Sequence, residues 1–309
     1  MKVLLVDVDS TIPNLALMQI STWHKDHGDE VTLLKGEYES FDTLNADKVY
    51  VSCIFRENRA QVLGILTIPK KAEIVLGGPG LNWDWLPAGI QKVKPDYDLY
   101  PGMEYSLGFT TRGCIRRCPW CVVPKKEGAL QRWQRVEEFH DERFGTVRLL
   151  DNNILADPEW FRLNTEFLLQ HDLALIEEGM DVRLLTPSLA ARLAEIRLAK
   201  PLKFAFDTMA IEPAVLKGIQ ILQDAGINTK RNVLFYVLVG YDGCMGGIPT
   251  TQEEDIYRCR LLREHRTGAF VMQFRSSPWT RRLAAWANRP QLFWPRDLDE
   301  TDYAAYRSQ

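Results

Sequence analysis

Short runs of valine, isoleucine and leucine alternate with amphipathic stretches along most of this chain, and this alternation limits the folds that it can adopt. The runs have the length of β-strands, and their nearly continuous apolar character is typical of strands covered on both faces. Strands that are separated by helices form parallel sheets, because each helix carries the chain back to the start of the next strand. The sequence therefore predicts an α/β protein built on parallel strands.

The first 100 residues predict a small Rossmann-like N-terminal domain. Its strands are expected at residues 2–8, 30–34, 48–54 and 72–78. In open sheets of this kind, ligands bind at the loops that follow the carboxyl ends of the strands. Neither a GxGxxG sequence nor a P-loop occurs in these loops, so no motif supports a dinucleotide or a nucleoside triphosphate.

A longer strand–helix pattern follows a polar linker and predicts a second domain over residues 101–275. Strands are expected at residues 105–111, 146–153, 180–185, 202–208, 232–240 and 269–274, and helices at residues 158–170, 187–198, 212–225 and 252–266. This succession predicts a partial (β/α)6 TIM-like barrel, in which the active site lies at the C-terminal ends of the strands. Residues 276–309 form a tail rich in tryptophan, which we expect to pack on the barrel.

Composition narrows the classes of function. The formal net charge is -3 over 309 residues, which does not indicate a nucleic-acid partner. No stretch approaches the roughly 18 apolar residues that a membrane span needs, so we expect no membrane partner. The opening MKVLLVDVDS has the pattern of a strand rather than of a signal peptide. Six cysteines in 309 residues are too few for a disulfide scaffold. We therefore expect a reducing compartment, the cytoplasm.

Three of the cysteines, Cys114, Cys118 and Cys121, lie in one short segment. Disulfides suit them poorly, because their number is odd and the expected compartment is reducing. Structural zinc needs four ligands, and the nearest histidine, His140, lies 19 residues beyond the last cysteine. A four-iron cluster held by three thiolates keeps one iron free for a non-protein ligand. The spacing favours such a cluster, and zinc stays open as the alternative.

The stretch CIRRCPWC, from Cys114 to Cys121 with Trp120 before the last cysteine, resembles the signature of the radical S-adenosylmethionine (SAM) superfamily. It follows the first predicted barrel strand, which is where that family carries it. The later segments LLDNN, GMDVRLL, FAFDT and FYVLVGYD are similar to strand ends of the subgroup with an N-terminal cobalamin-binding-like (B12-binding-like) domain. The resemblance covers the whole second domain.

The resemblance implies a [4Fe-4S] cluster on Cys114, Cys118 and Cys121, with SAM bound at the free iron. One electron from the cluster would cleave SAM, and the resulting 5′-deoxyadenosyl radical would abstract hydrogen from a substrate that no motif identifies. An external one-electron reductant, such as flavodoxin or ferredoxin, is implied as a partner. The alternatives are a cobalamin-dependent radical SAM methyltransferase and, from another class, a non-catalytic iron–sulfur or zinc-binding module.

The same resemblance suggests six cofactor-binding residues: Trp120, Asp151, Asn152, Asn153, Arg183 and Asp207. The segment 151–153 stands where the family binds the SAM amine, although it departs from the commoner glycine–glycine–glutamate form, and a simple turn is an equal alternative. Arg183 is expected to pair with the SAM carboxylate. Asp207 would accept a hydrogen bond from ribose or substrate, and the backbone around Trp120 would lie near adenine.

Two further features bear on cofactors. Cobalamin-dependent relatives carry an Asp-x-His-x-x-Gly loop whose histidine ligates cobalt, although some relatives bind cobalamin without it. Here DVDSTIPN occupies that place and contains no histidine, while Ser52 and Gly77–Gly78 resemble later elements of the fold. We therefore expect the first domain to keep the fold without binding cobalamin. Cys244, in a glycine-rich loop, is expected to be passive, with a hydrogen-donating thiol or an auxiliary ligand as the alternatives.

Overall fold

The computed structural model describes residues 1–36, 46–65, 72–170 and 173–294. The chain divides into two compact units. The first unit comprises residues 1–108 and 134–145, and the second comprises residues 109–133 and 146–309. The boundary predicted after residue 100 thus lies within the first unit, and the segment after residue 275 belongs to the second.

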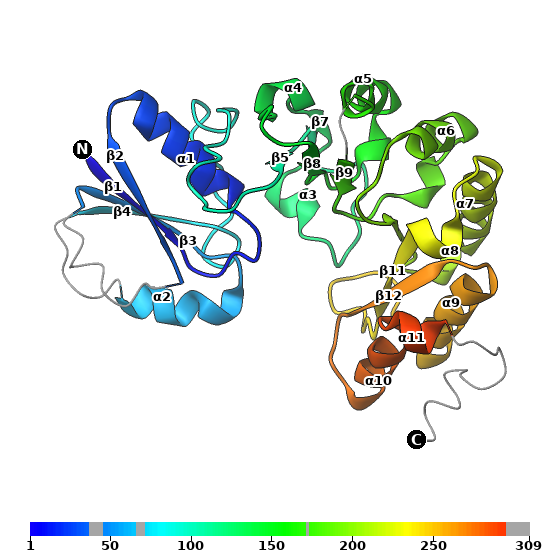
Figure 1. Cartoon of the computed structure of the whole chain (residues 1–309). Helices are drawn as coiled ribbons and strands as arrows, with labels where there is room; N and C mark the ends of the chain where they lie inside the picture. The colour runs from blue at the N-terminus through cyan, green and yellow to red at the C-terminus, as the bar shows by residue number, and fades with distance from the viewer. Residues whose placement is uncertain (37–45, 66–71, 171–172, 295–309) are drawn as a thin grey trace. The chain divides into compact units, whose positions relative to one another are not determined.

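The first unit is built on a four-stranded parallel sheet. Its elements are β1 (Lys2–Asp7), α1 (Leu15–Asp26), β2 (Glu30–Lys35), β3 (Lys48–Ser52), the 3-10 helix η2 (Arg56–Asn58), α2 (Arg59–Ile65), β4 (Glu73–Gly77), β5 (Ser106–Gly108) and α4 (Val136–Phe139). The strand order is β2-β1-β3-β4, and α1 and α2 lie on opposite faces of the sheet (Figure 1). Buried side chains of β1 and β3, among them Leu4 and Val51, form its core. This is the doubly wound arrangement that the four apolar runs predict.

The strand order reverses between β1 and β3, which is the place where sheets of this type bind ligands. The register sets Asp7 at the end of β1 beside Ser52 at the end of β3. The amide of Asn14, the N-cap of α1, donates to the Ser52 hydroxyl at 2.8 Å. Asp7 is fully buried and accepts a hydrogen bond of 2.7 Å from the Tyr100 hydroxyl. The two strand ends are therefore joined through a network of buried polar side chains.

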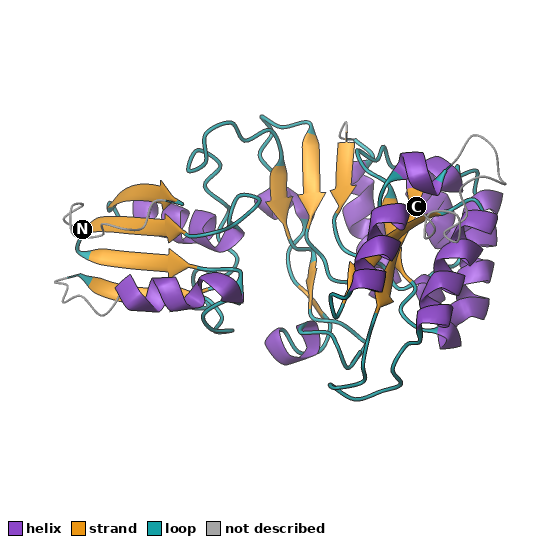
Figure 2. Cartoon of the chain, turned by 90° about the horizontal axis from the view of Figure 1, so that it is seen from below, coloured by secondary structure: helices purple, strands orange, loops and turns teal. Residues whose placement is uncertain are grey.

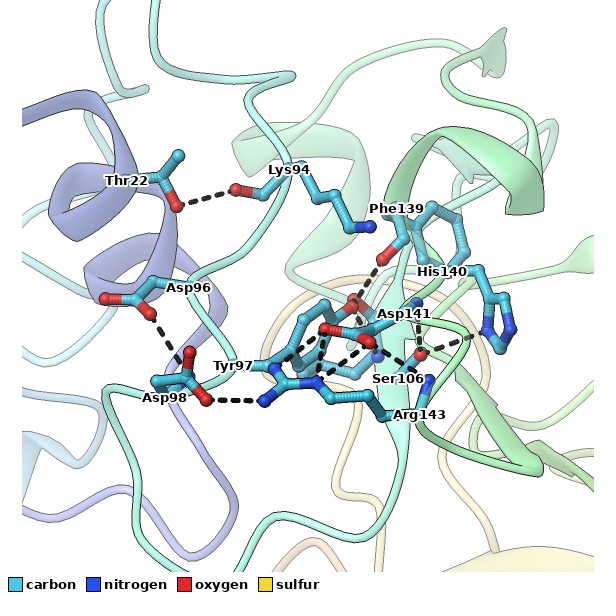
Figure 3. Close-up of polar contacts among 11 residues, drawn as sticks. Thr22, Lys94, Asp96, Tyr97, Asp98, Ser106, Phe139, His140, Asp141 and Arg143 are labelled. Carbon is cyan, nitrogen blue, oxygen red and sulfur yellow. Dashed lines mark hydrogen bonds and ion pairs between the residues drawn. The ribbon is translucent and has the colours of Figure 1, made fainter. Parts of the chain in front are cut away.

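Residues 134–145 return to the first unit through hydrogen bonds to the segment that precedes and forms β5 (Figure 3). The Tyr97 hydroxyl donates to the Phe139 carbonyl at 2.6 Å. The backbone N–H of Asp141 donates to the Ser106 hydroxyl at 2.9 Å. Because the bonded residues are 42 and 35 positions apart in the sequence, no local pattern predicts the return.

The second unit continues the strand–helix alternation. Its elements are β6 (Thr111–Arg112), α3 (Val123–Lys126), β7 (Gln131–Arg132), β8 (Thr146–Leu149), η3 (Ile154–Ala156), α5 (Pro158–Leu168), β9 (Leu173–Ile176), η4 (Val182–Leu184), α6 (Pro187–Glu195), β10 (Leu202–Ala205), η5 (Met209–Ile211), α7 (Glu212–Asp224), α8 (Thr229–Asn232), β11 (Val233–Val239), α9 (Gln252–Glu264), β12 (Gly268–Gln273), α10 (Pro278–Ala287) and α11 (Pro290–Phe293). β8 pairs with β9, and β10-β11-β12 form a sheet, all in parallel. Helices α5, α6, α7 and α9 follow one another along one side of these strands (Figures 1 and 2). The α/β class with parallel sheets is confirmed, and closure into a barrel stays a prediction.

The prediction of a strand at residues 180–185 is wrong. Only Met180 forms a parallel bridge, to Phe204, and Val182–Leu184 form a 3-10 helix instead. The side chain of Asp181 accepts a hydrogen bond from the Arg183 N–H, which closes the turn and competes with extended backbone. The strand between α5 and α6 is β9, which the sequence analysis missed.

The described part of the C-terminal tail packs on β12. Trp286 in α10 is fully buried, and its ring lies 5.1 Å from that of Phe293. Asn288 forms two hydrogen bonds with the backbone of Val271 in β12, at 2.7 and 3.2 Å. Residues 295–309 of the predicted tail lie outside the described residues. Within the described ranges, none of the helices combines the length and the apolarity that crossing a bilayer requires.

Candidate active site

The three clustered cysteines lie in a loop of the second unit, residues 113–128, which we call the cysteine loop. The short antiparallel strands β6 and β7 close its base, with Arg112 opposite Gln131. Inside it, the N–H of Cys121 donates to the Cys118 carbonyl at 3.0 Å, and α3 begins two residues later. The loop therefore has a fixed base and little regular structure of its own.

Gly113 opens the cysteine loop in a conformation that other residues rarely adopt. Its φ is +76°, and a Cβ built there would lie 2.2 Å from the Ala129 carbonyl oxygen. We expect Gly113→Ala to distort the loop and to reduce iron retention after anaerobic reconstitution by at least about tenfold. Gly128→Ala is a matched control, because it has a similar φ of +78° but no neighbouring atom within 4 Å. Equal iron content in both variants would show that the close contact is unimportant.

The three thiols interact electrostatically. Burial raises the pKa of Cys118 to about 11, and Asp207 and the other two cysteines act in the same direction. Among the described residues, no three Cys, His, Asp or Glu side chains form a ready site for a single metal ion. A [4Fe-4S] cluster would require each of the three thiolates to bind a different iron. Because thiolates are the ligands, cluster binding would release their protons.

Glu127 connects both ends of the cysteine loop to the segment after β8. Its carboxylate accepts two hydrogen bonds from Arg112, at 2.9 and 3.0 Å, and one of 2.9 Å from the Gly113 N–H. The Asn152 amide adds a fourth at 2.8 Å. Burial acts to raise the pKa of Glu127, but these donors outweigh it and lower the pKa below its usual value. Asn152 is thus engaged with Glu127.

Asp151 is engaged with the segment before the loop. Its buried carboxylate accepts hydrogen bonds from the N–H and hydroxyl groups of Thr110, at 3.0 and 2.6 Å. The corresponding groups of Thr111 donate at 2.5 and 2.7 Å. Four donors occupy the carboxylate, so this arrangement anchors the approach to the cysteine loop.

Asp181 forms a second connection to the cysteine loop. Its carboxylate accepts from Arg116 Nε at 2.5 Å and from Arg183 Nε at 2.7 Å. Burial acts to raise the pKa of Asp181, but the two arginines lower it overall. The Arg183 side chain is 37% exposed, so part of its guanidinium is accessible to solvent or to a ligand.

Asn153 is buried and only partly satisfied. Its side-chain oxygen accepts a hydrogen bond of 3.2 Å from the Asp181 N–H, while its Nδ2 has no hydrogen-bond partner among the residues that the structure describes. A buried donor without a partner costs about 1–3 kcal/mol, so such groups often serve a ligand. Within residues 151–153, Asn153 therefore has a side-chain N–H donor that could bind a ligand.

Asp207 follows β10 and lies within electrostatic reach of Cys118, Cys121 and Arg183. Burial is the main cause that raises its pKa, to about 6, while buried Arg258 acts in the opposite direction. The pKa of Asp207 thus lies within the range of ordinary buffers. It therefore offers a pH-dependent test of its environment.

We expect Asp207 to make the metal-free protein less stable as the pH rises from 3.8 to about 6. A carboxyl group whose pKa is higher in the folded state binds its proton more tightly when folded, so ionisation favours unfolding. Asp207→Asn should raise the free energy of unfolding at pH 7 by about 1–2 kcal/mol and change it little at pH 4. Urea unfolding at both pH values, with exposed Asp224→Asn as control, measures this. A destabilised Asp207→Asn at pH 7 would contradict it.

The ring of Trp120 packs on an aromatic cluster formed with Tyr241 and Phe274. Its ring meets that of Tyr241 edge-on at 5.1 Å, and Tyr241 meets Phe274 at 4.8 Å. A Cβ on Gly247 would lie 3.1 Å from Pro119, so the glycine-rich loop after β11 runs beside the cysteine loop. Cys244 in that loop is exposed, and Arg275 Nη2 lies 3.6 Å from its sulfur.

Two residues that hold the cysteine loop, Glu127 and Asp181, are absent from the candidates that the sequence suggests. The opposite charges of Arg112, just before the loop, and Glu127, near its end, were the available signal for the first. For Asp181, the short turn Asp-x-Arg was the signal, because its side chain caps η4.

Comparison with known proteins identifies a shared fold. No protein-family model and no curated protein matches the chain. Among solved structures, the radical SAM methyltransferase TsrM from Kitasatospora setae, with cobalamin and a [4Fe-4S] cluster bound, matches with a TM-score of 0.60 and 12% identity. The match covers 88% of this chain and 72% of TsrM. An arabinose-binding transporter component from Shewanella sp. ANA-3 and a D-isomer specific 2-hydroxyacid dehydrogenase from Lactobacillus delbrueckii ssp. bulgaricus reach TM-scores of only 0.21 and 0.22.

This comparison contradicts the expectation that cobalamin is absent. TsrM holds cobalamin as well as a cluster. The lack of histidine in DVDSTIPN is therefore no ground for excluding cobalamin. Across most of its length, this chain has the fold of the radical SAM methyltransferase TsrM.

Proposed function

We propose that this protein is a radical SAM enzyme in which Cys114, Cys118 and Cys121 bind a [4Fe-4S] cluster. The observation that carries the proposal is the mutual proximity of three thiols in one closed loop, in a chain with the fold of TsrM. Three thiolates leave one iron for SAM. When bound, the cluster would supply the electron that cleaves SAM for hydrogen abstraction from a substrate still to be found.

The geometry favours different roles for the candidate SAM residues. Asn153 Nδ2 and the Arg183 Nη groups are donors, so they suit the oxygens of a SAM carboxylate or ribose. Asp207 can accept from a hydroxyl or pair with an ammonium. The Trp120 segment, held by Tyr241, would border the adenine. Asp151 and Asn152 would act through the loop that they anchor.

Anaerobic reconstitution with iron and sulfide, followed by SAM and dithionite, tests this function. The expected product is 5′-deoxyadenosine, formed only when both the cluster and the reductant are present. A cluster that cycles between redox states without cleaving SAM would contradict the proposal and favour an electron carrier. Zinc with no iron uptake would favour a structural metal module. Repeating the assay with a flavodoxin or ferredoxin as the reductant would identify the external partner.

A cobalamin-dependent methyltransferase is the second candidate. Two observations favour it: the first unit has a doubly wound sheet with a switch point between β1 and β3, and TsrM binds cobalamin. Titration of the reconstituted protein with hydroxocobalamin should then change the corrin absorption spectrum at saturable stoichiometry. A titration without saturable binding, in protein that still cleaves SAM, would exclude this candidate and leave the first.

A further inference from the structure

The cysteine loop contains little that could hold its shape before a cluster is present. Its regular structure consists of the four-residue helix α3, and the strands at its base are two residues each. Such short elements make few backbone hydrogen bonds, so side-chain contacts must fix the conformation of the loop.

Glu127 has the contacts that such a role requires. Its side chain is 5% exposed, and that of Arg112 is 15% exposed, so the pair is largely shielded from water. Two parallel N–H···O bonds from Arg112 fix orientation as well as distance. The bond from the Gly113 N–H holds the residue immediately before Cys114. A single carboxylate thus joins the start and the end of the loop.

The link to Asn152 extends this arrangement to the strand layer. Asn152 Nδ2 donates to the same Glu127 oxygen that accepts from Gly113. Asn152 follows β8 directly after Asp151, whose carboxylate holds Thr110 and Thr111. Two adjacent residues at the end of β8 therefore hold this region: Asp151 holds the segment before the cysteine loop, and Asn152 holds the loop itself through the side chain of Glu127.

We propose that Glu127 is a positioning residue that holds the cysteine loop in its cluster-binding conformation before iron arrives. This rests on the proposed function, because it presumes that the three cysteines bind the cluster. Glu127 itself is not a ligand in this arrangement, since its four hydrogen bonds occupy both oxygens. Its effect is to keep Cys114 in place relative to Cys118 and Cys121.

The test compares Glu127→Gln with wild type by two measurements. The first is the rate of iron loss to a ferrous chelator from anaerobically reconstituted protein. The second is hydrogen exchange of residues 113–128 in the metal-free protein, which does not depend on activity. We expect iron loss to be about 10- to 100-fold faster in Glu127→Gln, with faster exchange confined to the loop. Arg112→Lys keeps the charge but loses the forked geometry, and should show a smaller change in the same direction.

Two controls separate this role from general stability. Glu166→Gln breaks an exposed ion pair with Arg162 and should match wild type in both measurements. Leu283→Ala removes a fully buried side chain from α10 and should lower the melting temperature without speeding iron loss. Wild-type rates in both Glu127→Gln and Arg112→Lys would overturn the proposal. If wild type takes up no iron, the proposed function is wrong, and the exchange of the metal-free loop still decides whether Glu127 positions it.

Discussion

Cys118→Ala is expected to abolish both the cluster and SAM cleavage. Cys118 lies between the other two cysteines in sequence, and its thiol is partly buried beside them. A cubane left with two protein thiolates loses a ligand at a second iron, so both its retention and the selective binding of SAM at one corner should fail. Iron and sulfide analysis after anaerobic reconstitution, together with 5′-deoxyadenosine formation, measures the loss.

Cys244→Ala provides the matched control for this experiment. Cys244 is exposed in a loop of the same unit and interacts with Asp242 and Arg275 rather than with the other cysteines. Its replacement should leave iron content and SAM cleavage at wild-type values. Full turnover in Cys118→Ala would overturn the assignment of the site, whereas loss in Cys244→Ala would give that thiol a role in cofactor binding or catalysis.

Arg258→Met is expected to produce the largest loss of stability in the second unit. The Arg258 side chain, on α9, is completely buried and donates to the carbonyls of Phe206 and Leu238 and to the carboxylate of Asp255. Its removal leaves a buried carboxylate without its cation and two buried carbonyls without their donor. Such losses cost about 3–5 kcal/mol, which urea unfolding of the metal-free protein can measure.

The control for Arg258→Met is Arg162→Met. Arg162 lies on the surface of α5 and is paired with exposed Glu166, so we expect its replacement to change the free energy of unfolding by less than about 0.5 kcal/mol. Since Arg258 holds Phe206, the residue before Asp207, its loss should also weaken SAM binding. A stability change no greater than that of Arg162→Met would contradict the view that this buried ion pair supports the strand ends.

The strand–helix alternation could be predicted because it follows from the local spacing of apolar residues in the sequence. The helices expected at residues 158–170 and 212–225 are α5 and α7, which begin within a residue of the predicted positions. Asp157 caps α5 with a side-chain hydrogen bond, and Pro158 occupies its first turn, so the start is encoded by adjacent residues. The strand expected at residues 180–185 failed because short apolar runs do not distinguish a strand from a turn closed by a side chain.

The site could be predicted only as far as its chemistry is local. Three closely spaced cysteines carry a specific signal, and residues at strand ends gather at one edge of parallel strands. Asp151 is bonded to Thr110, 41 positions away, and Glu127 is bonded to Arg112, 15 positions away. Contacts between such distant residues leave no periodic pattern in the sequence. The resemblance places Asp151 in the segment that binds the SAM amine, and no local pattern predicts the hydrogen bonds that its carboxylate accepts from Thr110 and Thr111. Glu127 had the sequence context of a solvated loop residue.

The most direct test of the central claim is electron paramagnetic resonance of the reduced, anaerobically reconstituted protein, recorded with and without SAM. We predict one [4Fe-4S] signal per chain that shifts when SAM is added, because SAM would bind the iron that has no cysteine ligand. A metal centre whose coordination is completed by side chains, or a cluster signal that SAM leaves unchanged, would contradict the account.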